Sequence, residues 1–187
     1  MWYLRKPELD PLAISMCGLK LGHRVLVVGS SDAALVAGLA SKVGLTGRAC
    51  LLDESQPRTD AAAAEVEKQG ALVESFSSPL SSLPFDADAF DAVVLRNVLG
   101  TLEPARRAAV LHEVLRVIRP GGRGIALDDA PRSGFWTLFR PAPAAAQAPG
   151  PAAIEQLSAA GFRGVRLLAE REGIVFVEGL KAAHPAN

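Results

Sequence analysis

Two short stretches carry the residues with the clearest potential for chemistry, and each of them follows an apolar run. One is GSSD (29–32), which follows RVLVV, and the other is Asp53-Glu54, which follows ACLL. Backbone N–H groups that open a helix, as those after the glycine would, bind polar and anionic groups. Asp53 lies 24 positions after Gly29, close to the spacing of about 20 at which an acidic side chain reaches ribose hydroxyls. The pattern predicts a nucleoside site, with a solvated aspartate after a strand as the alternative.

Other side chains that could transfer protons are scattered along the chain. His23 precedes the first apolar run, His112 lies on a surface-facing turn of a predicted helix, and His184 lies in the C-terminal tail. None of the three has a partner group within its stretch, so no catalytic residue is assigned. Asp128 and Asp129 follow the fifth apolar run, where the preferred interpretation is a solvated pair in a loop.

Composition limits the compartment and the partners. The 187 residues carry 20 basic and 20 acidic side chains, with formal net charge 0, so no attraction to nucleic acid or to an anionic membrane is expected. Near-neutral charge favours self-association, as in a homodimer. Cys17 and Cys50 form neither a disulfide framework nor a metal site and indicate free thiols in a reducing cytoplasm. We therefore expect a cytoplasmic protein with a small-molecule substrate and no bound metal.

Predicted strands and helices alternate along the chain, and these elements must position the residues described above. Short apolar runs predict buried strands, and stretches with helical spacing and good capping residues predict the helices between them. The predicted strands are 24–28, 49–52, 71–76, 90–97 and 123–127, and the predicted helices are 33–43, 58–69 and 103–118. Regular alternation of this kind is typical of a doubly wound α/β sheet.

The flanking segments complete a single domain over residues 1–187. Residues 1–22 are expected to be an N-terminal extension with one short helix, and 130–151, with five prolines and an aromatic cluster, a flexible loop. A helix over 152–160 and a hairpin of strands 164–170 and 173–179 close the sheet. The tail from 181 onward is expected to fray.

Three stretches, in this order, resemble the motifs of class I S-adenosylmethionine-dependent methyltransferases of the small, ubiquinone/menaquinone-biosynthesis-like type. They are RVLVVGSSDAALVAGLA, LPFDADAFDAVVLRNVLGTL and LHEVLRVIRPGGRGIALDD. The resemblance extends over about residues 20 to 180. It implies a Rossmann-like methyltransferase fold, with a mostly parallel seven-stranded sheet whose last strand is antiparallel. It also implies S-adenosyl-L-methionine as the cofactor and methyl transfer to a small molecule as the activity.

The resemblance also suggests cofactor contacts in this chain. Asp53 would hold the ribose hydroxyls, Ser31 and Asp32 would face the ammonium group, and Ser77 or Ser78 would accept from the adenine amine. The full set of expected cofactor-binding residues is Gly29, Ser30, Ser31, Asp32, Asp53, Glu54, Ser77, Ser78 and Arg96.

The chain departs from the family's pattern at four positions. Val27 stands where an acidic residue is usual, Ser31 and Ala33 stand where glycines are usual, and Pro79 replaces an acidic residue that contacts adenine. A Cβ atom in place of a glycine hydrogen narrows the approach of a ligand to the backbone. These departures keep a second hypothesis open, in which the domain is catalytically inactive and serves as a binding or structural module. A dinucleotide-dependent oxidoreductase is disfavoured, because GSSDAA does not match G-x-G-x-x-G.

Overall fold

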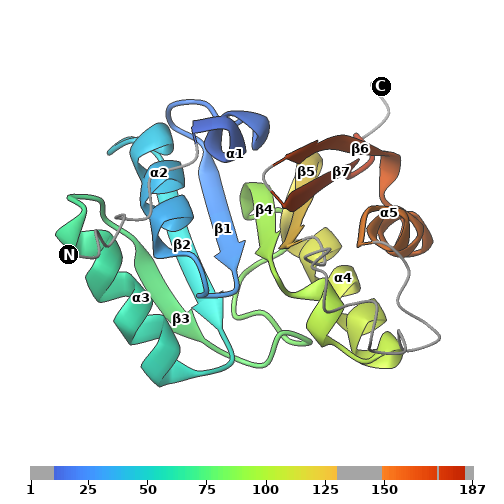
Figure 1. Cartoon of the computed structure of the whole chain (residues 1–187), viewed down its shortest axis with the longest axis horizontal. Helices are drawn as coiled ribbons and strands as arrows, with labels where there is room; N and C mark the ends of the chain where they lie inside the picture. The colour runs from blue at the N-terminus through green and yellow to red at the C-terminus, as the bar shows by residue number, and fades with distance from the viewer. Residues whose placement is uncertain (1–10, 130–148, 172, 184–187) are drawn as a thin grey trace, which may run out of the picture.

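A seven-stranded sheet forms the centre of the molecule, in the strand order β3-β2-β1-β4-β5-β7-β6 (Figure 1). The computed structural model describes residues 11–129, 149–171 and 173–183. Its strands are β1 (Arg24–Val28), β2 (Arg48–Asp53), β3 (Glu74–Ser77), β4 (Phe90–Arg96), β5 (Ile118–Asp129), β6 (Arg163–Arg171) and β7 (Ile174–Leu180). β1 to β5 pair in parallel, whereas β7 runs antiparallel to both β5 and β6. The predicted α/β fold, with its mostly parallel sheet and antiparallel last strand, is confirmed.

Helices cover both faces of the sheet, which explains the continuous apolar runs in the central strands. The helices are α1 (Pro11–Met16), α2 (Ala33–Val43), α3 (Gln56–Lys68), the 3-10 turn η1 (Leu99–Thr101), α4 (Pro104–Val117) and α5 (Pro149–Ala159). Val25 and Val27 pack with residues of α1, α2 and α3 on one face. Leu26 and Val28 pack with α4 and α5 on the other. Successive side chains of β1 therefore serve two separate cores.

The topology places several polar strand ends at one edge of the sheet. Strand order reverses at β1, which has β2 on one side and β4 on the other. In open α/β sheets a crevice for ligands forms beyond the carboxyl ends of the strands at such a switch point. Because β1, β2, β4 and β5 are parallel, Gly29, Asp53, Asn97 and Asp129 meet at this edge.

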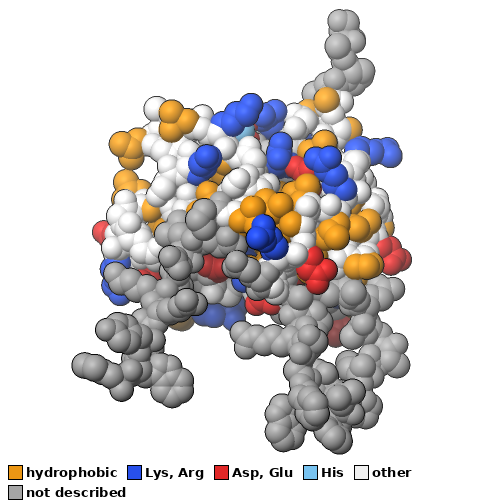
Figure 2. Space-filling model, turned by 45° about the horizontal axis from the view of Figure 1, so that its top comes forward, with side chains coloured by type: hydrophobic (Ala, Val, Ile, Leu, Met, Phe, Trp, Pro, Cys, Tyr) orange, Lys and Arg blue, Asp and Glu red, His pale blue; other side chains and the backbone are white. Residues whose placement is uncertain are grey.

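The opposite, amino-terminal edge of the sheet has a mixed surface. Figure 2 shows basic, acidic and hydrophobic side chains interspersed on the face that carries it. Arg48 and Glu74 form an exposed ion pair at the starts of β2 and β3, with 2.7 Å between Nη2 and Oε2. Leu21 and Leu45 are highly exposed, at 73% and 93%. A mixed surface of this kind agrees with the zero net charge of the sequence.

Several element boundaries differ from the sequence prediction. The first helix ends at Met16 rather than near Gly22, since Gly18 takes a positive φ of 60° that ends a right-handed helix. β3 starts at Glu74 rather than residue 71, because the Ala71 N–H still bonds to the Val66 carbonyl at the end of α3. β5 extends back to residue 118, where it pairs with the start of β4 before a register shift.

Several predictions lie outside the described residues. They concern the first ten residues of the N-terminal extension, residues 130–148 of the predicted flexible loop with Phe135, Trp136 and Phe139, and His184 in the tail. Within the described ranges, none of the helices has the length and apolar character that crossing a bilayer requires.

Candidate functional site

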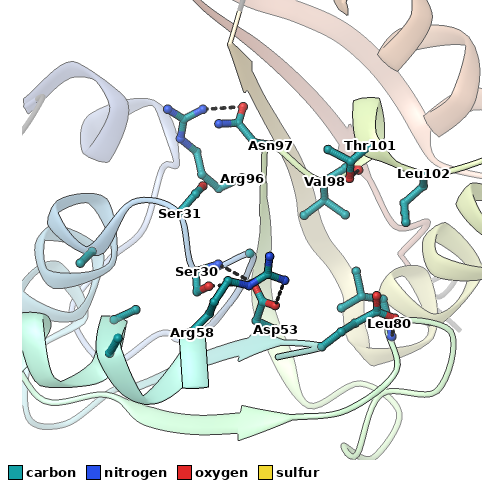
Figure 3. A pocket seen from close by; sticks show the side chains of 15 residues that line it. Ser30, Ser31, Asp53, Arg58, Leu80, Arg96, Asn97, Val98, Thr101 and Leu102 are labelled. Atoms are coloured by element: carbon teal, nitrogen blue, oxygen red, sulfur yellow. Dashed lines mark hydrogen bonds and ion pairs between the residues drawn. The ribbon is translucent and has the colours of Figure 1, made fainter. Parts of the chain in front are cut away.

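A cleft of about 580 Å³ opens at the carboxyl edge of the sheet, beyond the ends of β1, β2 and β4 (Figure 3). Its lining residues are Gly29, Ser30, Ser31, Ala33, Asp53, Glu54, Arg58, Ala61, Ala62, Leu80, Arg96, Asn97, Val98, Thr101 and Leu102. Six of the nine residues expected to bind a cofactor lie in this lining. The cleft is therefore the candidate ligand site, and it lies at the switch point of the sheet.

Gly29 ends β1 with a φ of 100°, a conformation that favours glycine. A Cβ atom here would lie 2.5 Å from the Arg96 carbonyl oxygen and 3.2 Å from Cγ2 of Val98. The glycine is thus required by the close approach of β4 and the segment after it. The next residues start α2, where the Asp32 carboxylate caps the helix by accepting the Leu35 N–H at 3.0 Å.

The Asp53 carboxylate, at the end of β2, receives four hydrogen bonds. Its Oδ2 accepts from the backbone N–H of Ser30 at 3.1 Å and from the Ser30 hydroxyl at 2.7 Å. Its Oδ1 accepts from the Ser55 N–H at 3.0 Å and from Nη2 of Arg58 at 2.6 Å. Burial alone would raise the pKa of Asp53, but these hydrogen bonds outweigh it and lower the pKa below the ordinary 3.8.

Arg96, at the end of β4, is a nearly buried cation among carboxylates. Its guanidinium bonds to Asp32 at 3.2 Å and to Asp129 at 2.7 Å, and only 9% of its side chain is exposed. Nη1 also donates to the Asn97 side-chain oxygen at 2.8 Å. Asn97 in turn receives the Asp129 N–H and donates to the Asp129 carboxylate. The ends of β4 and β5 and the start of α2 are thereby tied together.

The remaining predicted cofactor contacts differ in whether they line this cleft. Glu54 lines the cleft, and its Oε1 accepts from Arg106 at 2.8 Å and from the Leu80 N–H at 3.2 Å. The Ser77 hydroxyl donates to the Glu54 carbonyl, and the Ser78 hydroxyl donates to a neighbouring loop carbonyl. Asp32, Ser77 and Ser78 are not among the residues that line the cleft.

Asp128 is a partly buried carboxyl group at the end of β5, next to the Arg96 cluster. Burial raises its pKa to about 6, Arg96 and Arg107 act to lower it, and Asp129 adds to the rise. The sequence interpretation of a solvated pair in a loop is wrong in two respects: these residues belong to β5, and Asp128 is partly buried. His112 is exposed on α4, as expected.

Arg58 is the main site residue that the sequence did not reveal. The sequence prediction began its helix at residue 58, but α3 starts at Gln56, with a proline in its first turn. Arg58 therefore falls in the first helical turn, from which its side chain reaches the carboxylate at the end of β2. The proline after Gln56 is a signal that could have placed the helix start correctly.

Known proteins resemble this chain in sequence. A family model described as a methyltransferase domain matches residues 25–122, more than half of the chain. The ubiquinone/menaquinone biosynthesis C-methyltransferase UbiE of Chromobacterium violaceum is 27% identical over 130 residues, which cover 67% of this chain and 52% of that protein. UbiE of Nitrosospira multiformis is 29% identical over 116 residues, 62% of this chain and 47% of that protein. The chain spans about half the length of the curated relatives it matches.

Solved structures resemble it in fold. A SAM-dependent methyltransferase from Aquifex aeolicus matches with a TM-score of 0.77 and 22% identity, over 93% of this chain and 90% of that one. The strand order and the antiparallel β7 agree with this architecture. The family implies S-adenosyl-L-methionine as the cofactor. Because the family model covers more than half of its length, the chain belongs to the methyltransferase domain family.

Proposed function

We propose that the chain binds S-adenosyl-L-methionine in the cleft at the carboxyl edge of the sheet and transfers its methyl group to a small-molecule acceptor. The observation that carries the proposal is the position of Asp53, a carboxylate at the end of β2 that lines the cleft and accepts the Ser30 N–H beside the start of α2. The cleft's volume of about 580 Å³ lies within the range of about 300–1,000 Å³ usual for small-ligand sites.

The donor set of the cleft suits the parts of this cofactor. Asp53 offers carboxylate oxygens to ribose hydroxyls. Arg96 lines the cleft and suits the carboxylate of an amino acid group, and its partners Asp32 and Asp129 lie outside the lining. Leu80, Val98 and Leu102 supply an apolar wall suited to adenine. When bound, the cofactor supplies an electrophilic methyl group on a sulfonium centre.

The departures from the family pattern leave room for this fit. Ser31 and Ala33 line the cleft, and its volume is that which remains with their side chains in place. Val27 is 1% exposed and belongs to the core beneath the α2 face, so its side chain is not a cofactor contact. Asp32 stands five positions further along, and its carboxylate bonds to Arg96, which lines the cleft.

We further propose that the acceptor is the ring carbon of a small quinol. The support is the similarity to curated C-methyltransferases of ubiquinone and menaquinone biosynthesis. The chain's own contribution would be orientation of the ring against the methyl donor and exclusion of water.

Calorimetric titration with S-adenosylmethionine and S-adenosylhomocysteine tests cofactor binding. We expect saturable binding that Asp53→Ala weakens by about tenfold or more, since hydrogen bonds to a charged group contribute about 1.5–3 kcal/mol. The matched control is Asp60→Ala, on the exposed side of α3, which should bind as the unaltered chain does. Lack of binding by the unaltered chain would favour the inactive binding or structural module.

Methyl transfer is tested separately with radiolabelled cofactor. The probes are 1,4-naphthohydroquinone, which offers a ring carbon, and catechol, which offers oxygen. Label on the naphthohydroquinone ring carbon, located by NMR of the product, supports the quinol proposal. Label found only on oxygen would contradict it while leaving methyl transfer intact.

A further inference from the structure

The acceptor sites of the Asp53 carboxylate are all in use. A carboxylate offers about four lone-pair positions. Ser30 occupies two with its backbone N–H and its hydroxyl, and Ser55 and Arg58 occupy the other two. A ribose hydroxyl that donates to Asp53 must therefore replace one of these donors.

The four donors differ in how firmly they are held. The Ser30 and Ser55 N–H groups belong to the backbone at the starts of α2 and α3, and the Ser30 hydroxyl is on a short side chain in the same turn. Arg58 reaches Asp53 with a long side chain that is 67% exposed, whereas the Asp53 side chain is 12% exposed. In Figure 3 the Arg58 and Asp53 side chains point toward one another within the cleft. Of the four donors, Arg58 is therefore the one whose hydrogen bond to Asp53 is lost with the smallest change in free energy.

We propose that Arg58 acts as a displaceable latch on Asp53, and that ligands with a ribose bind by exchanging their hydroxyls for its guanidinium. Arg58 is then a residue that sets the affinity of the cleft for ribose-containing ligands by competing with them. The inference rests on the proposed function, because it takes Asp53 as the ribose contact. It concerns a residue that the sequence did not assign to the site.

The solvent exposure of the Arg58–Asp53 ion pair limits how strongly Arg58 can compete with ribose hydroxyls for Asp53. Exposed ion pairs contribute little, so removal of Arg58 should strengthen ribose binding by about two- to fivefold and no more. The same exposure makes the latch sensitive to salt, because mobile ions screen the guanidinium before they screen buried contacts.

The experiment compares the unaltered chain with Arg58→Ala, using adenosine and 2′,3′-dideoxyadenosine as uncharged probes in NMR or calorimetric titrations. We expect Arg58→Ala to bind adenosine about two- to fivefold more tightly and to bind dideoxyadenosine as the unaltered chain does. The gain should shrink toward onefold between low salt and about 0.5 M NaCl. Arg58→Lys, which keeps a cation but loses the planar fork, should fall between the two.

Arg48→Ala is the matched control, since it also removes an exposed arginine paired with a carboxylate, at the far end of β2. It should leave the affinity for both probes unchanged. Unchanged or weaker adenosine binding by Arg58→Ala, with S-adenosylhomocysteine still bound, would overturn the latch and leave the proposed function standing. An equal gain for both probes would also overturn it. Absence of any binding by all the proteins would overturn both.

Discussion

Two of the arginine–carboxylate contacts at the carboxyl edge of the sheet have opposite burial. On the β2 side the carboxylate is sheltered and the cation is not, with Asp53 12% and Arg58 67% exposed. On the β4 side the cation is sheltered and the carboxylates are not, with Arg96 9%, Asp32 30% and Asp129 58% exposed. The buried member of each contact makes further hydrogen bonds, Asp53 with Ser30 and Ser55 and Arg96 with Asn97.

This difference assigns different tasks to the two sides of one cleft. A fixed carboxylate with an exchangeable partner suits a neutral ligand group that donates hydrogen bonds, such as a hydroxyl pair. A fixed cation that lines the cleft suits the carboxylate of an amino acid group. The same contacts should also contribute very unequally to folding, because the Arg96 guanidinium makes its bonds away from water, whereas that of Arg58 is mostly solvated. Stability measurements can therefore test the comparison without any ligand.

The largest effect is expected from removal of the buried cation. Arg96→Met should lower the free energy of unfolding by about 3–4 kcal/mol, toward the lower end of the cost of breaking a buried pair, because its carboxylate partners keep some contact with water. Urea unfolding followed by circular dichroism measures it. Arg96→Lys retains the charge but cannot bond to both sides and should lose less. A loss below about 1 kcal/mol would remove the distinction between the two contacts.

The next effect concerns Gly29, which lies between the two contacts. Gly29→Ala should cost about 3 kcal/mol, because it adds both a positive-φ penalty and a Cβ atom 2.5 Å from the Arg96 carbonyl. Gly70→Ala is the matched control: φ is 81° there, but no atom lies within 4 Å. It should cost about 1 kcal/mol. Equal losses in the two variants would mean that β4 gives way to the added methyl group.

A smaller effect, of opposite sign, is expected at Asp128, which faces Arg96 and Arg107 from β5. Its pKa is about 6 in the folded chain against an ordinary 3.8, so its ionisation destabilises the fold as pH rises from about 4 through 6. Asp128→Asn should therefore stabilise the chain by about 2 kcal/mol at pH 8 and leave it unchanged near pH 4. Unfolding curves at both pH values test this. Destabilisation at pH 8 would show that the charged form is favoured by Arg96.

The two sides of the cleft also differ in how well the sequence predicted them. The fold, the turn at Gly29 and the position of Asp53 follow from local signals: apolar runs, a single glycine and one spacing. The sequence predicted Asp32 and Arg96 as cofactor contacts but not the ion pairs around Arg96, because residues 32, 96 and 129 meet only when β5 lies beside β4 and α2 starts next to them. Arg58 escaped notice because its role depends on a two-residue difference in where α3 begins.

The smallest effect is expected at Arg58 itself. Arg58→Ala should change the free energy of unfolding by less than about 0.5 kcal/mol at moderate salt, since its guanidinium is mostly solvated and Asp53 keeps three other donors. In the same urea assay, Arg96→Met and Arg58→Ala each remove an arginine that is paired with a carboxylate at this edge of the sheet. Their losses in free energy of unfolding should differ severalfold. A loss above about 1.5 kcal/mol would show that Arg58 is part of the framework that holds Asp53. In that case displacement of Arg58 from Asp53 by ribose hydroxyls would require a large free energy. Arg58→Ala should then show no gain in adenosine affinity.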